Sequence, residues 1–160
     1  MDFEQRLQKA IERGERSRTV RDRAEMARQL TAEEIRSRHS SARTDLSDTI
    51  EACVRKLADH FPGFQYQSVI GSDGWGAKVS RDDIRLQAGR GSDGLYSRLE
   101  MVVTPLGSAP IVEILAKGTI RNREVFHRRH YQRLDELDLT VMQQMIEQWV
   151  LEYAEQYAAV

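Results

Sequence analysis

The segment EVFHRRHY, residues 124–131, places two histidines and two arginines among aromatic neighbours. Imidazole is a common metal ligand, and a guanidinium binds phosphate or carboxylate through paired hydrogen bonds. On a helix His127 and His130 would share a face, whereas on a strand residues three apart point to opposite faces and cannot chelate one ion. Because both faces of such a strand carry polar side chains, we expect an edge strand or a half-open sheet face here. The segment therefore predicts neither a metal site nor a cofactor.

The same segment belongs to a local basic patch. Its anion-binding candidates are Arg121, Arg123, His127, Arg128, Arg129 and His130. Such a patch can bind nucleic acid through the phosphates. Against this, the chain has a net charge of −1, carries no helix-turn-helix, RRM or KH signature, and continues directly into an acidic C-terminal segment that would neutralise the patch. Nucleic-acid binding is therefore an alternative function and not the leading one.

A carboxylate at Glu113 interrupts the apolar run IVEILA. If it faces solvent, it needs no explanation. If it is buried, its pKa would be raised and it could act as a general base. A cross-strand arginine such as Arg98 or Arg121 can pair with it. Structural pairing is the favoured interpretation, and catalysis is the alternative.

Other catalytic signatures are absent from the sequence. Cys53 lies in the apolar stripe of an expected helix, where a thiol behaves as a small hydrophobic group. The chain contains no G-x-S-x-G, G-x-G-x-x-G or G-x-x-x-x-G-K-[ST] motif. We predict no catalytic residue, and a non-enzymatic protein is favoured.

The elements that would position these residues begin with helices. Residues 1–30 form an expected helical arm with a short apolar stripe at Phe3, Leu7 and Ile11. The segment RGERSRTVRDR interrupts this stripe, so the arm is either mobile or docks on a partner subunit. A new helix begins at Thr31, where Glu34 completes a capping box, and ends at the FPG of residues 61–63.

From residue 64 the apolar period changes to two, which predicts strands. The expected strand segments are FQYQSVI, WGAKVS, DIRLQA, LYSRLEMVVT, PIVEILAKGTI and EVFHRRHY. The sequence GSDG occurs at 71–74 and again at 91–94, where a carboxylate between glycines suggests either calcium binding or a hairpin turn. Each copy offers one carboxylate, too few for a calcium loop, so both are expected to be hairpin turns.

A long amphipathic helix is expected to close the chain. We predict an α+β fold in residues 31–160, with N-terminal helices, an antiparallel meander of about five to six strands, and the C-terminal helix packed on one sheet face. This order resembles helix-grip folds, in which a curved sheet wraps a long C-terminal helix and can enclose a cavity. The residues expected to line such a cavity are Trp75, Met145, Trp149 and Tyr153, with Glu113 as a polar anchor. An ordinary filled core is the competing interpretation.

Composition and charge limit the class of protein. Hydrophobic residues make up 40% and charged residues 31% of the 160 residues, as in globular proteins. Cys53 is the single cysteine, the N-terminal segment is charged throughout, and no apolar run approaches the roughly 20 residues needed to span a bilayer. We therefore expect a cytoplasmic location and no membrane partner. Residues 134–160 carry six acidic and no basic residues, whereas the centre is basic.

The sequence supports three hypotheses from different classes. The leading one is a non-enzymatic interaction or regulatory module, homo-oligomeric through the arm residues Phe3, Leu7 and Ile11. The second is a helix-grip-like protein or enzyme that binds a small ligand between the sheet and the C-terminal helix. The third is nucleic-acid binding through residues 121–133.

Overall fold

The computed structural model of the chain describes residues 2–28, 30–87 and 91–160, with the side chains of 27, 28, 84–87 and 91–93 excepted. Its helices are α1 (Phe3–Arg28), α2 (Ala32–His60) and α3 (Leu139–Ala158), and a 3-10 turn spans Leu134–Glu136. Its strands are β1 (Gln65–Gly71), β2 (Gly74–Gln87), β3 (Gly91–Val103), β4 (Ile111–Ile120) and β5 (Arg123–Arg133). The chain divides into two compact units, one ending at Ile35 and one spanning Arg36–Val160. No helix in the described ranges combines the length and apolar character needed to cross a membrane.

Helix α1 is continuous over its whole length. The segment RGERSRTVRDR, which interrupts the apolar stripe, remains helical because arginine and glutamate are good helix formers and dominate it. Successive turns are also linked. The Arg16 guanidinium lies 3.8 Å from the Glu12 carboxylate, and the Thr19 hydroxyl donates to the Glu15 carbonyl at 3.0 Å.

Helix α2 begins and ends where the sequence predicted. The backbone N–H of Glu34 donates to the Thr31 hydroxyl at 3.1 Å, which is the first hydrogen bond of the expected capping box. The helix ends at His60, directly before the FPG segment, where Gly63 adopts a φ of 102°. Helix α3 begins at Leu139, with Asp138 accepting from the N–H of Val141 at its start.

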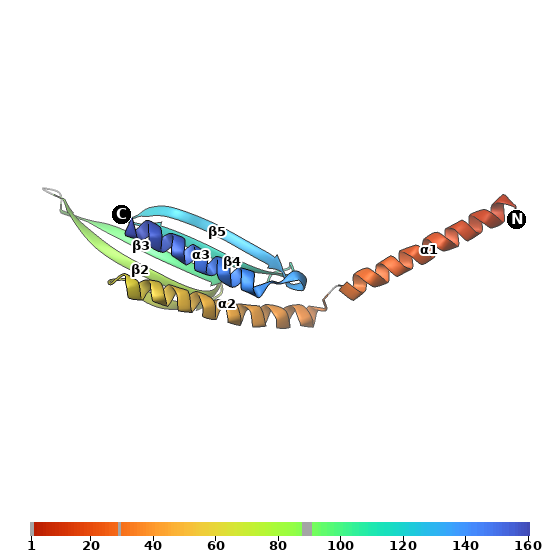
Figure 1. Cartoon of the computed structure of the whole chain (residues 1–160), viewed down its shortest axis with the longest axis horizontal. Coiled ribbons are helices and arrows are strands. Elements are labelled where there is room, and N and C mark those ends of the chain that lie inside the picture. The colour runs from red at the N-terminus through yellow and green to blue at the C-terminus, as the bar shows by residue number, and fades with distance from the viewer. Residues whose placement is uncertain (1, 29, 88–90) are drawn as a thin grey trace. The chain divides into compact units, whose positions relative to one another are not determined.

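The five strands form one antiparallel sheet in the order β1-β2-β3-β4-β5, so every strand pairs with its neighbour in sequence (Figure 1). Helices α2 and α3 lie side by side across one face of this sheet (Figure 1). They run in the same direction, since Gln143 donates to Thr49 at 3.2 Å and the rings of Phe61 and Tyr157 lie 4.9 Å apart. The predicted α+β fold is confirmed.

The core lies between the sheet and the two helices. Side chains alternate along each strand, so every second residue faces the helices. In β4 these buried residues are Val112, Ile114, Ala116 and Ile120. Their counterparts on the helices are Leu46, Ile50, Val54, Met142, Ile146 and Tyr153. The opposite face of the sheet carries the partly exposed residues of each strand.

The two GSDG segments have different structures. In the first, Gly71 pairs with Gly74 and the residues between them form the predicted hairpin turn. The second lies inside β3, paired with residues 84–87 of β2, so a turn at 91–94 is wrong. The ladder of β2 and β3 continues past this point, and the expected strands WGAKVS and DIRLQA are one strand, β2. The connection between β2 and β3 falls on residues 88–90, outside the described residues.

Candidate functional site

The basic residues of β5 divide between the two faces of the sheet. β5 is an edge strand, as expected from its sequence. Arg128 and His130 lie on the face that the helices cover, and His127 and Arg129 lie on the other face. The two histidines therefore point apart. No cluster of three or more metal-ligating side chains occurs in the part of the chain that the structure describes.

Carboxylates from neighbouring elements contact two of the four basic residues of this strand segment. The guanidinium of Arg128 forms an ion pair with Glu152 of α3. On the other face, the guanidinium of Arg129 lies 3.8 Å from the Glu113 carboxylate of β4. The acidic C-terminal helix therefore neutralises part of the basic patch, as the sequence suggested.

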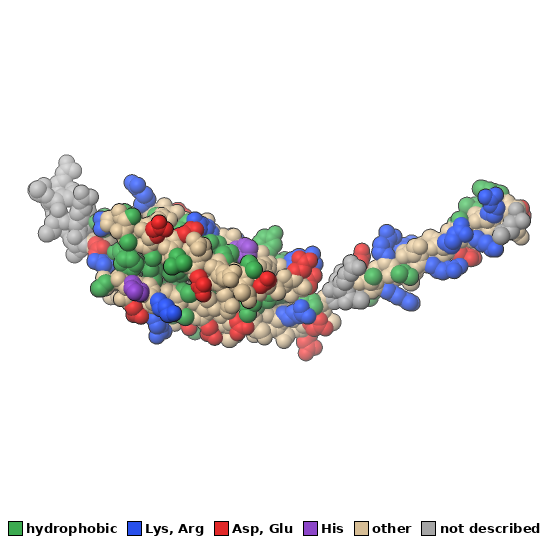
Figure 2. Space-filling model, viewed as in Figure 1, with side chains coloured by type: hydrophobic (Ala, Val, Ile, Leu, Met, Phe, Trp, Pro, Cys, Tyr) green, Lys and Arg blue, Asp and Glu red, His purple; other side chains and the backbone are tan. Residues whose placement is uncertain are grey.

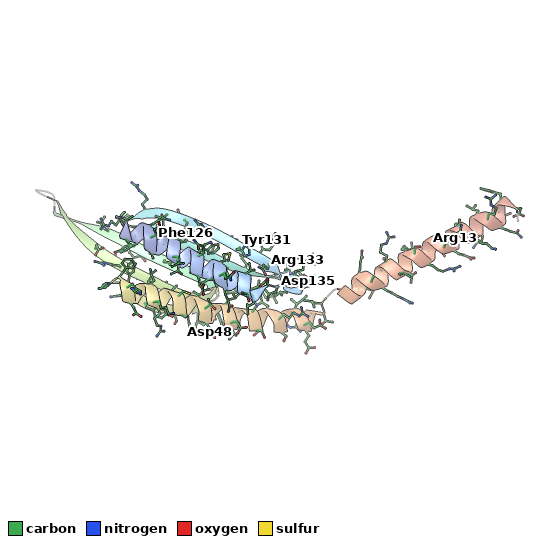
Figure 3. All side chains as sticks on the ribbon, in the orientation of Figure 1. Arg13, Asp48, Phe126, Tyr131, Arg133 and Asp135 are labelled. Atoms are coloured by element: carbon green, nitrogen blue, oxygen red, sulfur yellow. The ribbon has the colours of Figure 1, made fainter. Side chains whose placement is uncertain are left out.

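The ends of β5 carry the remaining arginines. Arg121 and Arg123 are exposed at the turn between β4 and β5. At the other end, Arg133 donates two hydrogen bonds to Asp135, of 3.1 and 2.8 Å (Figure 3). The patch is therefore not one continuous surface, because its members lie on two faces and at both ends of an eleven-residue strand.

Glu113 lies on the sheet face that the helices leave open. It is directly opposite Tyr131, and its side chain is 19% exposed. Its arginine partner is Arg129, the diagonal neighbour on the adjacent strand, and not Arg98 or Arg121 as the sequence suggested. Arg98 lies opposite Thr119 of β4. Thr119 is about 20 Å along the strand from Glu113, so Arg98 is too far away to contact it.

Tyr153 is a fully buried residue of α3. Its hydroxyl donates to the Thr119 carbonyl at 2.8 Å, and its ring packs edge-on against Phe126 with centroids 6.4 Å apart. Burial raises the pKa of the phenol, so the hydroxyl stays protonated. These contacts give Tyr153 a structural role in the core.

Of the other expected ligand-binding residues, Met145 and Trp149 lie on α3, two turns and one turn before Tyr153, whereas Trp75 and Glu113 come from strands. Trp149 is 8% exposed. Met145 is partly buried. Trp75 is stacked under the guanidinium of Arg43, whose central carbon lies 3.5 Å from the ring centroid. The sheet separates Glu113 from Trp149, because Glu113 projects from the open face. A pocket between sheet and helix cannot use Glu113 as its polar anchor.

A groove opens between the C-terminal halves of α2 and α3, on their outer surface. Its volume is about 650 Å³, and its apolar lining consists of Cys53, Leu57, Phe61, Val150, Leu151, Ala154 and Ala158. Figure 2 shows hydrophobic side chains gathered over this part of the helical layer. Leu57 and Val150 are buried at its base, whereas Leu151 is 62% exposed. The groove forms because two parallel helices that both pack on the sheet leave a furrow along their outer sides.

Aromatic side chains support one end of the groove. Phe61 lines the groove and also packs edge-on against Tyr157 at 4.9 Å and against Phe64 at 6.3 Å. Phe64 in turn contacts Tyr157 at 4.9 Å. Three mutually packed aromatic rings therefore form the wall at this end.

Charged side chains border the groove with opposite signs on its two sides. α3 contributes the carboxylates of Glu147 and Glu155, and α2 contributes the ammonium group of Lys56 beside the imidazole of His60. Burial raises the pKa of the Cys53 thiol. The nearby Glu147 raises it further, and Lys56 opposes the effect. Cys53 is therefore a protonated, weakly nucleophilic thiol in the groove wall.

Helix α1 carries the arm residues singled out in the sequence. Phe3 is 74%, Leu7 46% and Ile11 47% exposed, so the whole apolar stripe is open to solvent. Along this helix, eight basic and five acidic side chains give a net charge of +3. One of them, Arg13, is labelled in Figure 3 and extends away from the helix axis.

The groove was missed in the sequence because its lining comes from two helices about ninety residues apart. Cys53 was assigned to the apolar stripe of an expected helix. On α3, Leu151 and Ala154 lie beside the buried residues Val150 and Tyr153. They make the apolar face of this helix wider than the core requires, and this width was the sequence signal for a groove.

No protein family model matches the chain, and neither does any curated protein or solved structure.

Proposed function

We propose that the protein is a non-enzymatic interaction module that self-associates through its N-terminal arm, helix α1. The observation that carries this proposal is the exposure of Phe3, Leu7 and Ile11 along one side of a charged helix. Burying such side chains stabilises by roughly 1.5–3 kcal/mol each. A contiguous apolar stripe on a helix is typical of a surface that a partner covers.

The charge distribution supports association between copies. Helix α1 has a net charge of +3, and α3, with three acidic and no basic side chains, has −3. Complementary surfaces on one chain favour encounters between copies and suppress other partners. The carboxylate considered as a general base, Glu113, lies in an ion pair with Arg129.

Measurement of mass in solution tests the proposal. We expect the full chain to sediment above the 18.4 kDa of one copy at micromolar concentration. The variant Leu7→Glu should shift the equilibrium to the monomer. The control Gln5→Glu adds the same charge in the same turn but on the opposite side of the helix, and it should leave the mass unchanged. A wild-type monomer at every concentration up to about 100 μM, well above the affinities of stable assemblies, refutes the proposal.

Nucleic-acid binding through β5 is the second candidate, because Arg121 and Arg123 are exposed side by side at one turn. Binding through phosphates weakens steeply as salt increases. A gel shift with generic DNA and RNA at low salt tests this candidate. An Arg121→Gln/Arg123→Gln variant should lose the shift, and an unshifted wild type at low salt excludes it.

A further inference from the structure

We infer that the arm of one copy seats in the α2/α3 groove of a second copy, parallel to both helices. This inference rests on the proposed self-association and names the surface that receives the arm. The occupant is helix α1, with Phe3, Leu7 and Ile11 entering the groove.

The stripe and the groove have the same length. On the arm, Phe3 and Ile11 are eight residues apart, and so are Cys53 of α2 and Phe61, the residue directly after this helix. Eight residues of α-helix span about 12 Å. Three apolar side chains one turn apart can therefore face a furrow lined at the same interval by Cys53, Leu57 and Phe61.

The charges flanking the stripe match those that border the groove. An α-helix turns by about 100° per residue. Arg6 and Arg13 therefore lie on one flank of the stripe, and Glu4 and Glu15 lie on the other. The groove is acidic along α3 and basic along α2. A single docked helix can satisfy both borders at once.

This two-sided match also fixes the direction of the arm. The right-handed helix sense puts the Arg6 and Arg13 flank over α3 only when the arm runs in the same direction as α2 and α3. In this orientation Arg6 reaches Glu147 and Arg13 reaches Glu155. The reverse direction would place arginines against Lys56, which costs free energy.

Each copy carries one arm and one groove, so two copies can exchange arms reciprocally. An exchange of this kind has twofold symmetry and closes as a dimer.

The single native cysteine makes the contact directly testable. Wild-type chain, which has only the groove thiol of Cys53, is mixed with full-length Phe3→Cys/Cys53→Ser chain, which has only an arm thiol. Under mild oxidation we expect a mixed disulfide between the two, identified by mass spectrometry. Because each chain has one thiol, this bond can form only between copies.

Position controls define the contact and its direction. A Gln5→Cys/Cys53→Ser chain, with the thiol on the far side of the arm, should cross-link at least tenfold more slowly. Faster cross-linking of an Ile11→Cys/Cys53→Ser chain than of the Phe3→Cys chain would overturn the parallel direction. Equal, slow cross-linking at all three positions would overturn the docking itself.

A groove variant separates failure of this inference from failure of self-association. Leu151→Glu changes a side chain that is already 62% exposed, so folding is retained. We expect it to raise the dissociation constant of the assembly on the order of tenfold or more, while Gln148→Glu, an exposed position on the same helix, has no such effect. A wild-type monomer refutes the proposed function, whereas an oligomer that Leu151→Glu leaves intact refutes only the groove as its docking surface.

Discussion

Asn122 pairs with Tyr96 through two hydrogen bonds of equal length. The backbone N–H of Asn122 donates to the Tyr96 carbonyl at 2.8 Å, and the N–H of Tyr96 donates to the side-chain oxygen of Asn122, also at 2.8 Å. A third bond runs from the Asn122 side-chain amide to the Gly94 carbonyl at 2.8 Å. The ladder between β3 and β4 ends at Arg98 and Thr119. Through Asn122, the turn between β4 and β5 adds hydrogen bonds to β3 beyond that end.

Substitution of Asn122 tests how much this turn stabilises the domain. Asn122 adopts a φ of 67°, which favours asparagine or glycine. We expect Asn122→Gly to lower the free energy of unfolding by about 1–2 kcal/mol, because two side-chain hydrogen bonds are lost. Asn122→Ala should lose roughly 1 kcal/mol more through backbone strain. Urea unfolding measures both values, and equal stabilities of the two variants would contradict the strain argument.

Gly76 allows β2 and β3 to approach closely. A side chain added here would overlap the carbonyl oxygen of Met101. We expect Gly76→Ala to destabilise the protein by about 3 kcal/mol, since the ladder must separate to accommodate the methyl group. Gly107→Ala is the matched control, because an added Cβ at Gly107 meets no other atom within 4 Å. Thermal unfolding of the two variants should differ clearly, and equal midpoints would show that the sheet yields at little cost.

His39 makes stability depend on pH. Burial and then the charge of Arg43 hold the pKa of His39 below the ordinary imidazole value, while a hydrogen bond with the Thr104 backbone opposes this. Below a pH of about 6.5 the unfolded chain takes up a proton that the folded chain does not. The stability that neutral His39 provides is complete above that pH and falls as the pH drops toward the folded pKa.

A comparison of variants isolates this contribution. Between pH 7.5 and pH 5.5 we expect wild-type protein to lose more free energy of unfolding than His39→Leu, which has no titrating group at this position. His60→Gln removes an exposed histidine and should retain the wild-type loss. Identical pH dependence of wild type and His39→Leu would show that His39 titrates alike in both states.

The thiol of Cys53 should react slowly with alkylating reagents. Because burial and Glu147 raise its pKa, the thiolate fraction at pH 8 is smaller than for an ordinary cysteine. We expect Glu147→Gln to lower this pKa and speed alkylation by iodoacetamide, and Lys56→Gln to slow it. Rates measured from pH 7 to 10 give the pKa of each variant. The opposite order of the two variants would contradict this account of the groove charges.

Much of the fold was predictable because its signals are local. Period-two alternation identified the strands, and the capping pair of Thr31 and Glu34 located the start of α2. One local signal misled. The GSDG at 91–94 matches the true turn at 71–74 in sequence, yet the longer ladder of β2 and β3 keeps it extended.

The site was less predictable because it depends on which elements become neighbours. Alternation correctly separated His127 from His130, since strand geometry alone decides this. The partner of Glu113 depends on the register of β4 against β5, and the sequence offered several arginines with no means of choosing. The groove depends on the parallel placement of α2 and α3, which no single segment encodes.

The common direction of α2 and α3 gives the helical layer an electrical polarity. Each helix has a macrodipole with about half a negative charge at its C-terminal end, so roughly one elementary charge accumulates where both helices end beside Phe61 and Tyr157. The guanidinium of Arg81 lies at this end and donates to the Pro62 carbonyl at 2.6 Å. The negative ends of both helix dipoles therefore meet at one end of the layer, next to an arginine of β2 that also forms an ion pair with Asp83.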